Sequence, residues 1–340
     1  MRLTAPIELM LFLYFITYLP NIIATKLVTS LPHEGFGRAL TGLETLPSTL
    51  IMNLVMTYLF IWLSGWHREA NATQIGGRRI PIPTKYTLLS GFGTALILFT
   101  VPLSFTFEGV SIPYIQLLMR GDILIIAPLV DLAFGRKVRW WSWTALVMVF
   151  IALAFVIQQK GELGLPPLAI ATVVLYTLGY FVRLAVMTKV SKSGDPASIK
   201  KYFVEEKVVA LPLSVLALAA LSLSGLGSQA GQLEFGFIEV WTDPVILPLV
   251  FIAGTLTIVS IFAAIILLDA RENTYCVPLE RSASLLAGVI GAYILSLGWG
   301  LKAPTGSEIF GAFILIAAIA LLSLAPRFDR KMNAARAEAQ

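Results

Sequence analysis

Long apolar runs recur along the whole chain and are separated by short polar connections. A helix needs about 20 mostly apolar residues to cross the hydrocarbon core of a bilayer. Segments of this kind fall at 7–29, 45–66, 86–106, 112–133, 141–158, 167–188, 207–226, 244–268, 275–297 and 308–326. The longest connections, at 67–85, 189–206 and 227–243, are too short for a soluble domain. The pattern therefore predicts an all-α membrane protein with ten transmembrane helices.

The composition supports a membrane protein and argues against several other classes of protein and site. Hydrophobic residues make up 57% of the 340 residues and charged residues only 13%, against about 25% charged residues in soluble domains. The single cysteine, Cys276, excludes an internal disulfide and a CxxC site. No phosphate-binding loop, metal-ligand spacing or Ser/His/Asp set stands out. We therefore expect no cofactor, no metal, no nucleic-acid partner and no enzyme activity, with the lipid bilayer and a small-molecule substrate as partners.

The Lys and Arg residues are unevenly divided between the two sets of alternating connections. With the N-terminus inside, most of the 25 basic residues fall on the inner side, Lys207 among them. The outer side holds only Lys26, Arg38, Lys160 and Lys302. Because basic loops stay in the cytoplasm, both termini are expected to be cytoplasmic, in an inner (cytoplasmic) membrane of bacterial type.

Ten helices divide into two sets of five, and the second set then enters the membrane in the opposite sense. This division matches an inverted repeat, an architecture that many secondary transporters have. The expected units are residues 1–160, residues 161–326 and a cytoplasmic tail at 327–340. Small residues inside the segments are expected to let helices approach closely: Gly91, Gly93, Gly254, Gly288, Gly291 and Gly311.

Ten short helices, a tight third-to-fourth hairpin and a charged turn before a Gly/Ala-rich fifth helix resemble the drug/metabolite transporter superfamily. The fourth-to-fifth turn, "FGRKVRW", lacks the family's acidic residue, whereas the matching turn near the end carries Glu308. "YLPNIIATKLV" and "VPLERSASLL" resemble the sugar-phosphate and nucleotide-sugar branch, with Asn21 then Lys26 in the first and Glu280-Arg281 in the second. The resemblance implies a secondary transporter that works by alternating access.

Ionisable residues also occur inside the apolar segments, where each costs about 2.5–3.5 kcal/mol on insertion scales. At 100° per residue, Arg120 and Asp131 share one face of segment 112–133 with Gln116, whereas Asp122 lies about 200° from Arg120. Asp131 is expected to be wetted at the cytoplasmic end. A buried arginine suits an anion, because its guanidinium binds carboxylate or phosphate through two parallel bonds.

These positions predict a central substrate site. Its expected members are Arg120, Arg183, Arg281, Asn21, Lys26, Gln116, Tyr114, Tyr176, Tyr180 and Ser284, and the possible proton carriers are Asp122 and Glu280. The alternative is structural ion pairing, of Asp122 with Arg183 or of Glu280 with its neighbours.

The leading hypothesis is a secondary transporter for a small polar metabolite that is anionic or zwitterionic. One alternative is a proton-coupled exporter of amphipathic compounds, with Tyr, Trp and Met as the binding surface. Another is a membrane-embedded enzyme or lipid-handling scaffold, which would need a reactive group of residues at the interface.

The topology makes a direct prediction for reporter fusions. Fusions within 107–111 and 225–243 should report an outside location, and fusions within 67–85 and 189–206 an inside location, because the basic connections stay in the cytoplasm. Activity of paired inside- and outside-specific reporters at each position measures this, each serving as the control for the other. A reversed pattern would contradict the orientation and the inverted repeat together.

Overall fold

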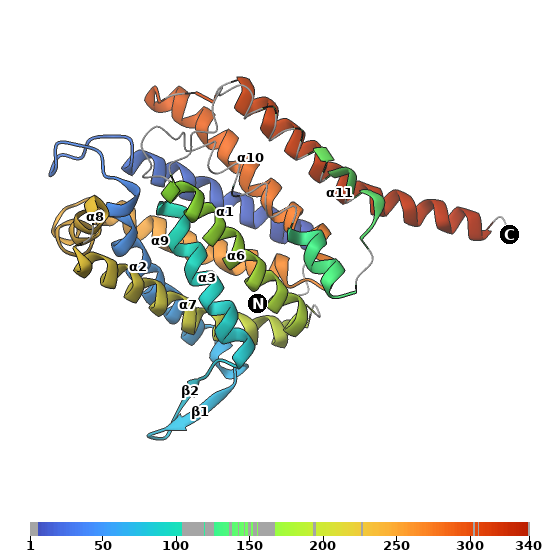
Figure 1. Ribbon diagram of the computed structural model, residues 1–340, viewed down its shortest axis with the longest axis horizontal. Helices are drawn as coiled ribbons and strands as arrows, with labels where there is room; N and C mark the ends of the chain where they lie inside the picture. The colour runs from blue at the N-terminus through green and yellow to red at the C-terminus, as the bar shows by residue number, and fades with distance from the viewer. Residues whose placement is uncertain are drawn as a thin grey trace.

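The computed structural model gives a helical bundle with one small β-hairpin (Figure 1). It describes residues 6–103, 119, 126–135, 138–141, 143–145, 147–148, 151, 155, 167–192, 195–225, 227–301, 303–304 and 306–338.

The long helices follow the apolar runs. They are α1 (Ile7–Val28), α2 (Gly42–Leu63), α3 (Lys85–Leu103), α6 (Pro167–Val190), α7 (Pro196–Ser224), α9 (Ile246–Leu267), α10 (Asn273–Trp299) and α11 (Gly306–Glu338). By length and composition, 6 of the helices in the described residues can cross a membrane: α1, α2, α6, α7, α9 and α10. The chain is thus a helical, multi-pass membrane protein. The expected segments 112–133 and 141–158 lie largely outside the described residues, so the count of ten and the inverted repeat stay predictions.

Two helix bounds differ from the prediction. Helix α7 begins at Pro196 rather than near 207, because the Asp195 carboxylate caps it by accepting from the Ser198 amide at 2.9 Å. Lys207, assigned to a cytoplasmic connection, instead lies buried inside α7 with its Nζ 5.6 Å from the Phe203 ring centroid. Helix α11 continues to Glu338 through most of the expected tail, and it extends beyond the bundle in Figure 1.

The three longest expected connections all carry regular structure. Strands β1 (Ala72–Ile75) and β2 (Arg78–Pro81) form an antiparallel hairpin that projects from the bundle (Figure 1), so the fold is not purely α. Gly76 and Gly77, with φ of 58° and 76°, make the two-residue turn that such a hairpin favours. A 3₁₀ turn, η1 (Trp66–Arg68), precedes the hairpin. Helix α8 (Gly227–Ile238) and the 3₁₀ turn η3 (Glu239–Thr242) occupy the last connection.

Close helix approach occurs at two of the expected glycines. Helix α3 packs between α6 and α7, and α1 packs between α9 and α10. A Cβ on Gly93 would lie 2.7 Å from the Gly179 carbonyl oxygen, and one on Gly91 would lie 2.5 Å from the Val209 Cβ. Both predictions are confirmed. At Gly288, a Cβ would meet nothing within 4 Å among the described residues.

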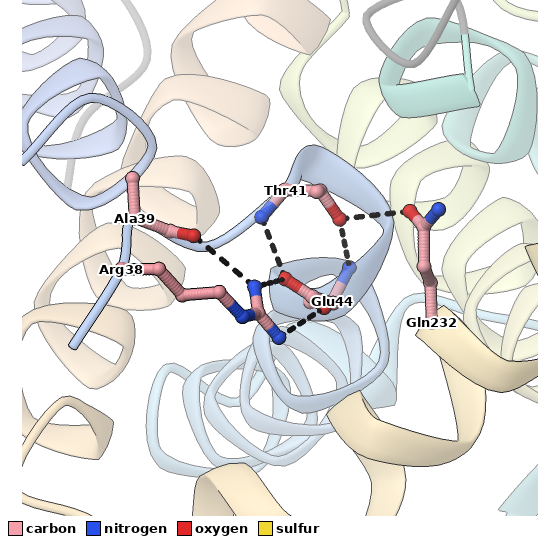
Figure 2. Close-up of polar contacts among 5 residues, drawn as sticks. All are labelled: Arg38, Ala39, Thr41, Glu44 and Gln232. Atoms are coloured by element: carbon pink, nitrogen blue, oxygen red, sulfur yellow. Dashed lines mark hydrogen bonds and ion pairs between the residues drawn. The ribbon is translucent and has the colours of Figure 1, made fainter. Parts of the chain in front are cut away.

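At one end of the bundle, a charged cap joins the connection before α2 to α8 (Figure 2). Thr41 and Glu44 form a capping box, in which each side chain accepts from the other residue's amide, at 3.2 and 2.8 Å. Arg38 donates to both Glu44 carboxylate oxygens at 2.8 and 2.7 Å, and these hydrogen bonds raise the pKa of Arg38. The Thr41 hydroxyl donates to Gln232 of α8 at 2.9 Å. Two connections predicted to be outer thus contact each other.

At the opposite end, the hairpin is anchored on α7. The buried Glu205 carboxylate accepts from the Asn71 amide at 3.0 Å and from the Thr87 hydroxyl at 2.8 Å. Lys201 donates to the Asn71 side-chain oxygen at 3.1 Å. We call this end of the bundle the hairpin end.

Candidate functional site

Charged and phenolic side chains gather in one layer of the bundle. Tyr14, Arg183, Glu206 and Glu280 each lie about seven to ten residues from the hairpin end of their helix. At 1.5 Å per residue, this places them about 10–15 Å deep. We call this level the polar layer, and it divides into two clusters.

In the first cluster, Arg183 of α6 pairs with Glu206 of α7. The Arg183 Nε donates to Oε1 at 2.7 Å and an Nη donates to Oε2 at 3.4 Å. Glu206 Oε1 also accepts from Thr94 at 2.6 Å and from Tyr202 at 3.2 Å. The Glu206 side chain is 0% exposed and the Arg183 side chain 11%.

This carboxylate is saturated by partners from three helices. A buried ion pair is stable only when further hydrogen bonds satisfy its remaining capacity, and Glu206 meets that condition. Arg183, expected in the substrate site, is therefore occupied by a protein carboxylate. Among the described residues its partner is Glu206. Asp122, the alternative partner, lies outside them.

The second cluster joins α1, α6 and α10. The Tyr14 hydroxyl donates to Glu280 Oε1 at 2.6 Å, and Glu280 Oε2 lies 3.1 Å from Arg281 Nε. The Arg281 guanidinium carbon lies 4.8 Å from the Tyr180 ring centroid, which is within cation–π range. Tyr180 in turn contacts the Tyr176 ring at a centroid distance of 6.0 Å. We call these residues the Glu280–Arg281 cluster.

Unlike the first cluster, this one has unfilled hydrogen-bonding capacity. Among the described residues, the buried side-chain polar atoms without a hydrogen bond are Tyr180 Oη, Glu280 Oε2, Arg281 Nε and Asn273 Oδ1. All but the last belong to the Glu280–Arg281 cluster. The 3.1 Å contact between Glu280 and Arg281 is thus electrostatic and lacks hydrogen-bond geometry. Native proteins rarely leave such atoms without a protein, water or ligand partner.

The other expected site residues contact the protein itself, lie exposed, or fall outside the described residues. Ser284 is buried and donates to its own helix, at the Arg281 carbonyl oxygen, at 2.8 Å. Asn21 donates to the Ile252 carbonyl oxygen at 3.0 Å and to Thr255 at 2.9 Å, so it ties α1 to α9. Lys26 is exposed near the end of α1 opposite the hairpin end. Tyr114, Gln116, Arg120 and Asp122 lie outside the described residues.

The structure therefore brings together Tyr176, Tyr180, Glu280, Arg281 and Ser284. It adds Tyr14, which the sequence reasoning missed because Tyr14 joins the cluster through a contact between helices, to Glu280 of α10. Glu206 was missed because it was counted in a connection. Its sequence signal is the Asp195-Pro196 helix start, which places it within α7.

Asp131 is not wetted, contrary to expectation. It is 1% exposed and accepts from the Asn273 side chain at 3.0 Å and from the Thr274 amide at 3.1 Å. The carboxylate thus satisfies the free amide at the start of α10, next to the positive end of that helix. Asn273 also donates to Thr188 of α6 at 2.7 Å. This contact fixes the start of α10 beside the end of α6.

Comparison with known proteins informs the fold only. No family model matches the chain. No curated protein matches it either. A solved structure described as "Crystal structure of protein" superposes with a TM-score of 0.58, covering 94% of this chain and 97% of that chain at 14% identity. At this identity, the likeness shows a shared fold over nearly the whole length of both chains.

The saturated Arg183–Glu206 pair predicts strong coupling between its two residues. Arg183→Met or Glu206→Met alone should each cost about 3–5 kcal/mol, because each leaves a buried charge unpaired. The double variant should cost far less than the sum. Melting temperatures in detergent for the four proteins measure this cycle.

The exposed pair Arg139–Asp329, at 3.2 Å, provides the matched control. The same cycle made there with alanine should show coupling below about 1 kcal/mol. Additive effects at Arg183 and Glu206 would contradict their assignment as one structural unit.

Proposed function

We propose that this chain is a secondary transporter for a small polar metabolite, anionic or zwitterionic, which binds at the Glu280–Arg281 cluster. The observation that carries the proposal is the gathering of unsatisfied buried polar atoms on Tyr180, Glu280 and Arg281, within the polar layer. A polar solute from water would fill this capacity. In a membrane protein, buried ionisable groups of this kind mark substrate pathways.

The position of the cluster also favours transport. It lies where α1, α6 and α10 meet, about 10–15 Å from the hairpin end. Transporters hold their substrate sites near the bilayer midplane, between helices that move relative to one another. The proposal includes the ten-helix inverted repeat, cytoplasmic termini, and a bacterial inner membrane, supported by the apolar runs and the basic connections.

A membrane-embedded enzyme is the weaker candidate for this cluster. Its members are phenols, a carboxylate and a guanidinium, with Arg281 next to Glu280. Such groups bind and orient a polar solute. Nucleophilic catalysis would need a nucleophile within hydrogen-bond reach of a base that is itself oriented by a third group.

The proposal predicts a ligand whose binding depends on Arg281. In a thermal-shift screen of the purified protein against metabolite classes, at least one small polar solute should raise the melting temperature by mass action. Arg281→Lys keeps the charge but loses the planar fork. It should therefore need a roughly ten- to hundredfold higher concentration of that solute, as expected for about 1.5–3 kcal/mol.

Arg68→Lys is the matched control, because Arg68 is exposed at the hairpin end. It should bind the solute as the wild type does. The assignment of Arg281 to a site fails if no solute depends on it. It also fails if Arg281→Lys binds normally while its ligand-free melting temperature falls sharply, which would make Arg281 a structural residue.

A further inference from the structure

The two unsatisfied charged atoms of the Glu280–Arg281 cluster have opposite signs. Glu280 Oε2 is a hydrogen-bond acceptor on an anion, and Arg281 Nε is a hydrogen-bond donor on a cation. They lie 3.1 Å apart on successive residues of α10. The Glu280 side chain is 4% exposed and the Arg281 side chain 16%.

The remaining contacts hold both side chains in place. Tyr14 fills the other Glu280 oxygen, Oε1, and the Tyr180 ring lies against the guanidinium of Arg281. Glu280 Oε2 and Arg281 Nε are thus in charge contact with each other, but neither makes a hydrogen bond among the described residues.

The charge of a ligand determines how favourably it would bind beside Glu280 and Arg281. A purely anionic ligand would pair with Arg281 but would lie next to the Glu280 carboxylate, which repels it and keeps its unmet acceptor. A purely cationic ligand would pair with Glu280 but would lie next to the Arg281 guanidinium, which repels it and keeps its unmet donor. A ligand with an N–H donor on a cation and an oxygen acceptor on an anion would satisfy both atoms and would match both charges. Charges left unpaired in such surroundings are costly.

We propose that the transported solute is a small zwitterion with an ammonium group and a carboxylate on the same carbon, as in α-amino acids. The ammonium donates to Glu280 Oε2, and the carboxylate accepts from the Arg281 guanidinium. Tyr180 presents to the same ligand a hydroxyl that meets no hydrogen-bond partner within the described part of the chain. This inference rests on the proposed function and narrows its substrate class.

The first test uses the wild-type full chain and single-charge analogues. Each of the common L-amino acids is screened by thermal shift, and every stabilising one is compared with its N-acetyl and carboxamide forms. The N-acetyl form lacks the ammonium and the carboxamide lacks the carboxylate. Each should need at least tenfold more ligand for the same shift. Equal potency of the free and N-acetyl forms would overturn the zwitterion assignment.

A second test uses Glu280→Gln, which removes the charge but keeps an acceptor for Tyr14. It should weaken binding of the free amino acid at least tenfold while leaving the N-acetyl form unchanged or strengthened. Glu234→Gln, on the exposed face of α8, is the charge-matched control and should change neither. If Glu280→Gln still prefers the free amino acid over its N-acetyl form as strongly as the wild type does, the role of Glu280 is overturned. The analogue comparison stands even if this variant does not fold.

Inorganic phosphate and succinate separate failure of this inference from failure of the proposed function. If either anion stabilises the protein in an Arg281-dependent way and no amino acid does, the zwitterion assignment is overturned while the transport site stands. If none of these probes stabilises the protein, the zwitterion assignment is overturned. If the wider metabolite screen also finds no solute whose binding depends on Arg281, the proposed binding site is overturned as well.

Discussion

Hydrocarbon offers no hydrogen-bond partner, and this constraint governs every polar group in the interior of the bundle. A polar or charged side chain there must be satisfied by the chain itself or by something that enters from water. Asn21 meets the constraint by donating to α9, and Asp131 meets it by capping α10. These contacts fix how neighbouring helices sit against each other. Under the same constraint, several interior polar atoms that gather in one place without partners suggest a site for a solute or water.

Arg183 and Arg281, both in the polar layer, illustrate the two cases. One charge is satisfied by the protein, and the other keeps unfilled hydrogen-bonding capacity. Arg183 makes two hydrogen bonds to Glu206, whose carboxylate also receives hydroxyl groups from α3 and α7. Arg281 has a charge contact with Glu280 and a ring contact with Tyr180, and its Nε makes no hydrogen bond among the described residues. The first pair stabilises the bundle. The second leaves hydrogen-bonding capacity that we propose a solute fills. On this proposal, burial alone does not distinguish a structural charge from a binding charge.

The sequence predicts the long helices well, because the thickness of hydrocarbon sets a length that apolar runs reveal directly. It predicts the hairpin and α8 poorly, since the same length criterion discards short elements; the Gly76-Gly77 turn was the available signal. Of the expected site residues, Tyr176 and Tyr180 lie beside Arg281, whereas Arg183 pairs with Glu206. Helical spacing could not assign partners between helices, so Glu206 and Tyr14 were missed. Which charges are satisfied depends on side-chain geometry across helices, and a single sequence does not specify that geometry.

The central claim is that the polar capacity of Glu280 and Arg281 is filled by a solute rather than by the protein. An experimental map of the full chain in lipid nanodiscs, recorded with a stabilising solute at saturation, tests this most directly. The account predicts non-protein density bridging Glu280 Oε2 and the Arg281 guanidinium. A side chain of the protein filling both positions, such as the carboxylate of Asp122 on Arg281 with no solute density beside it, would contradict the account.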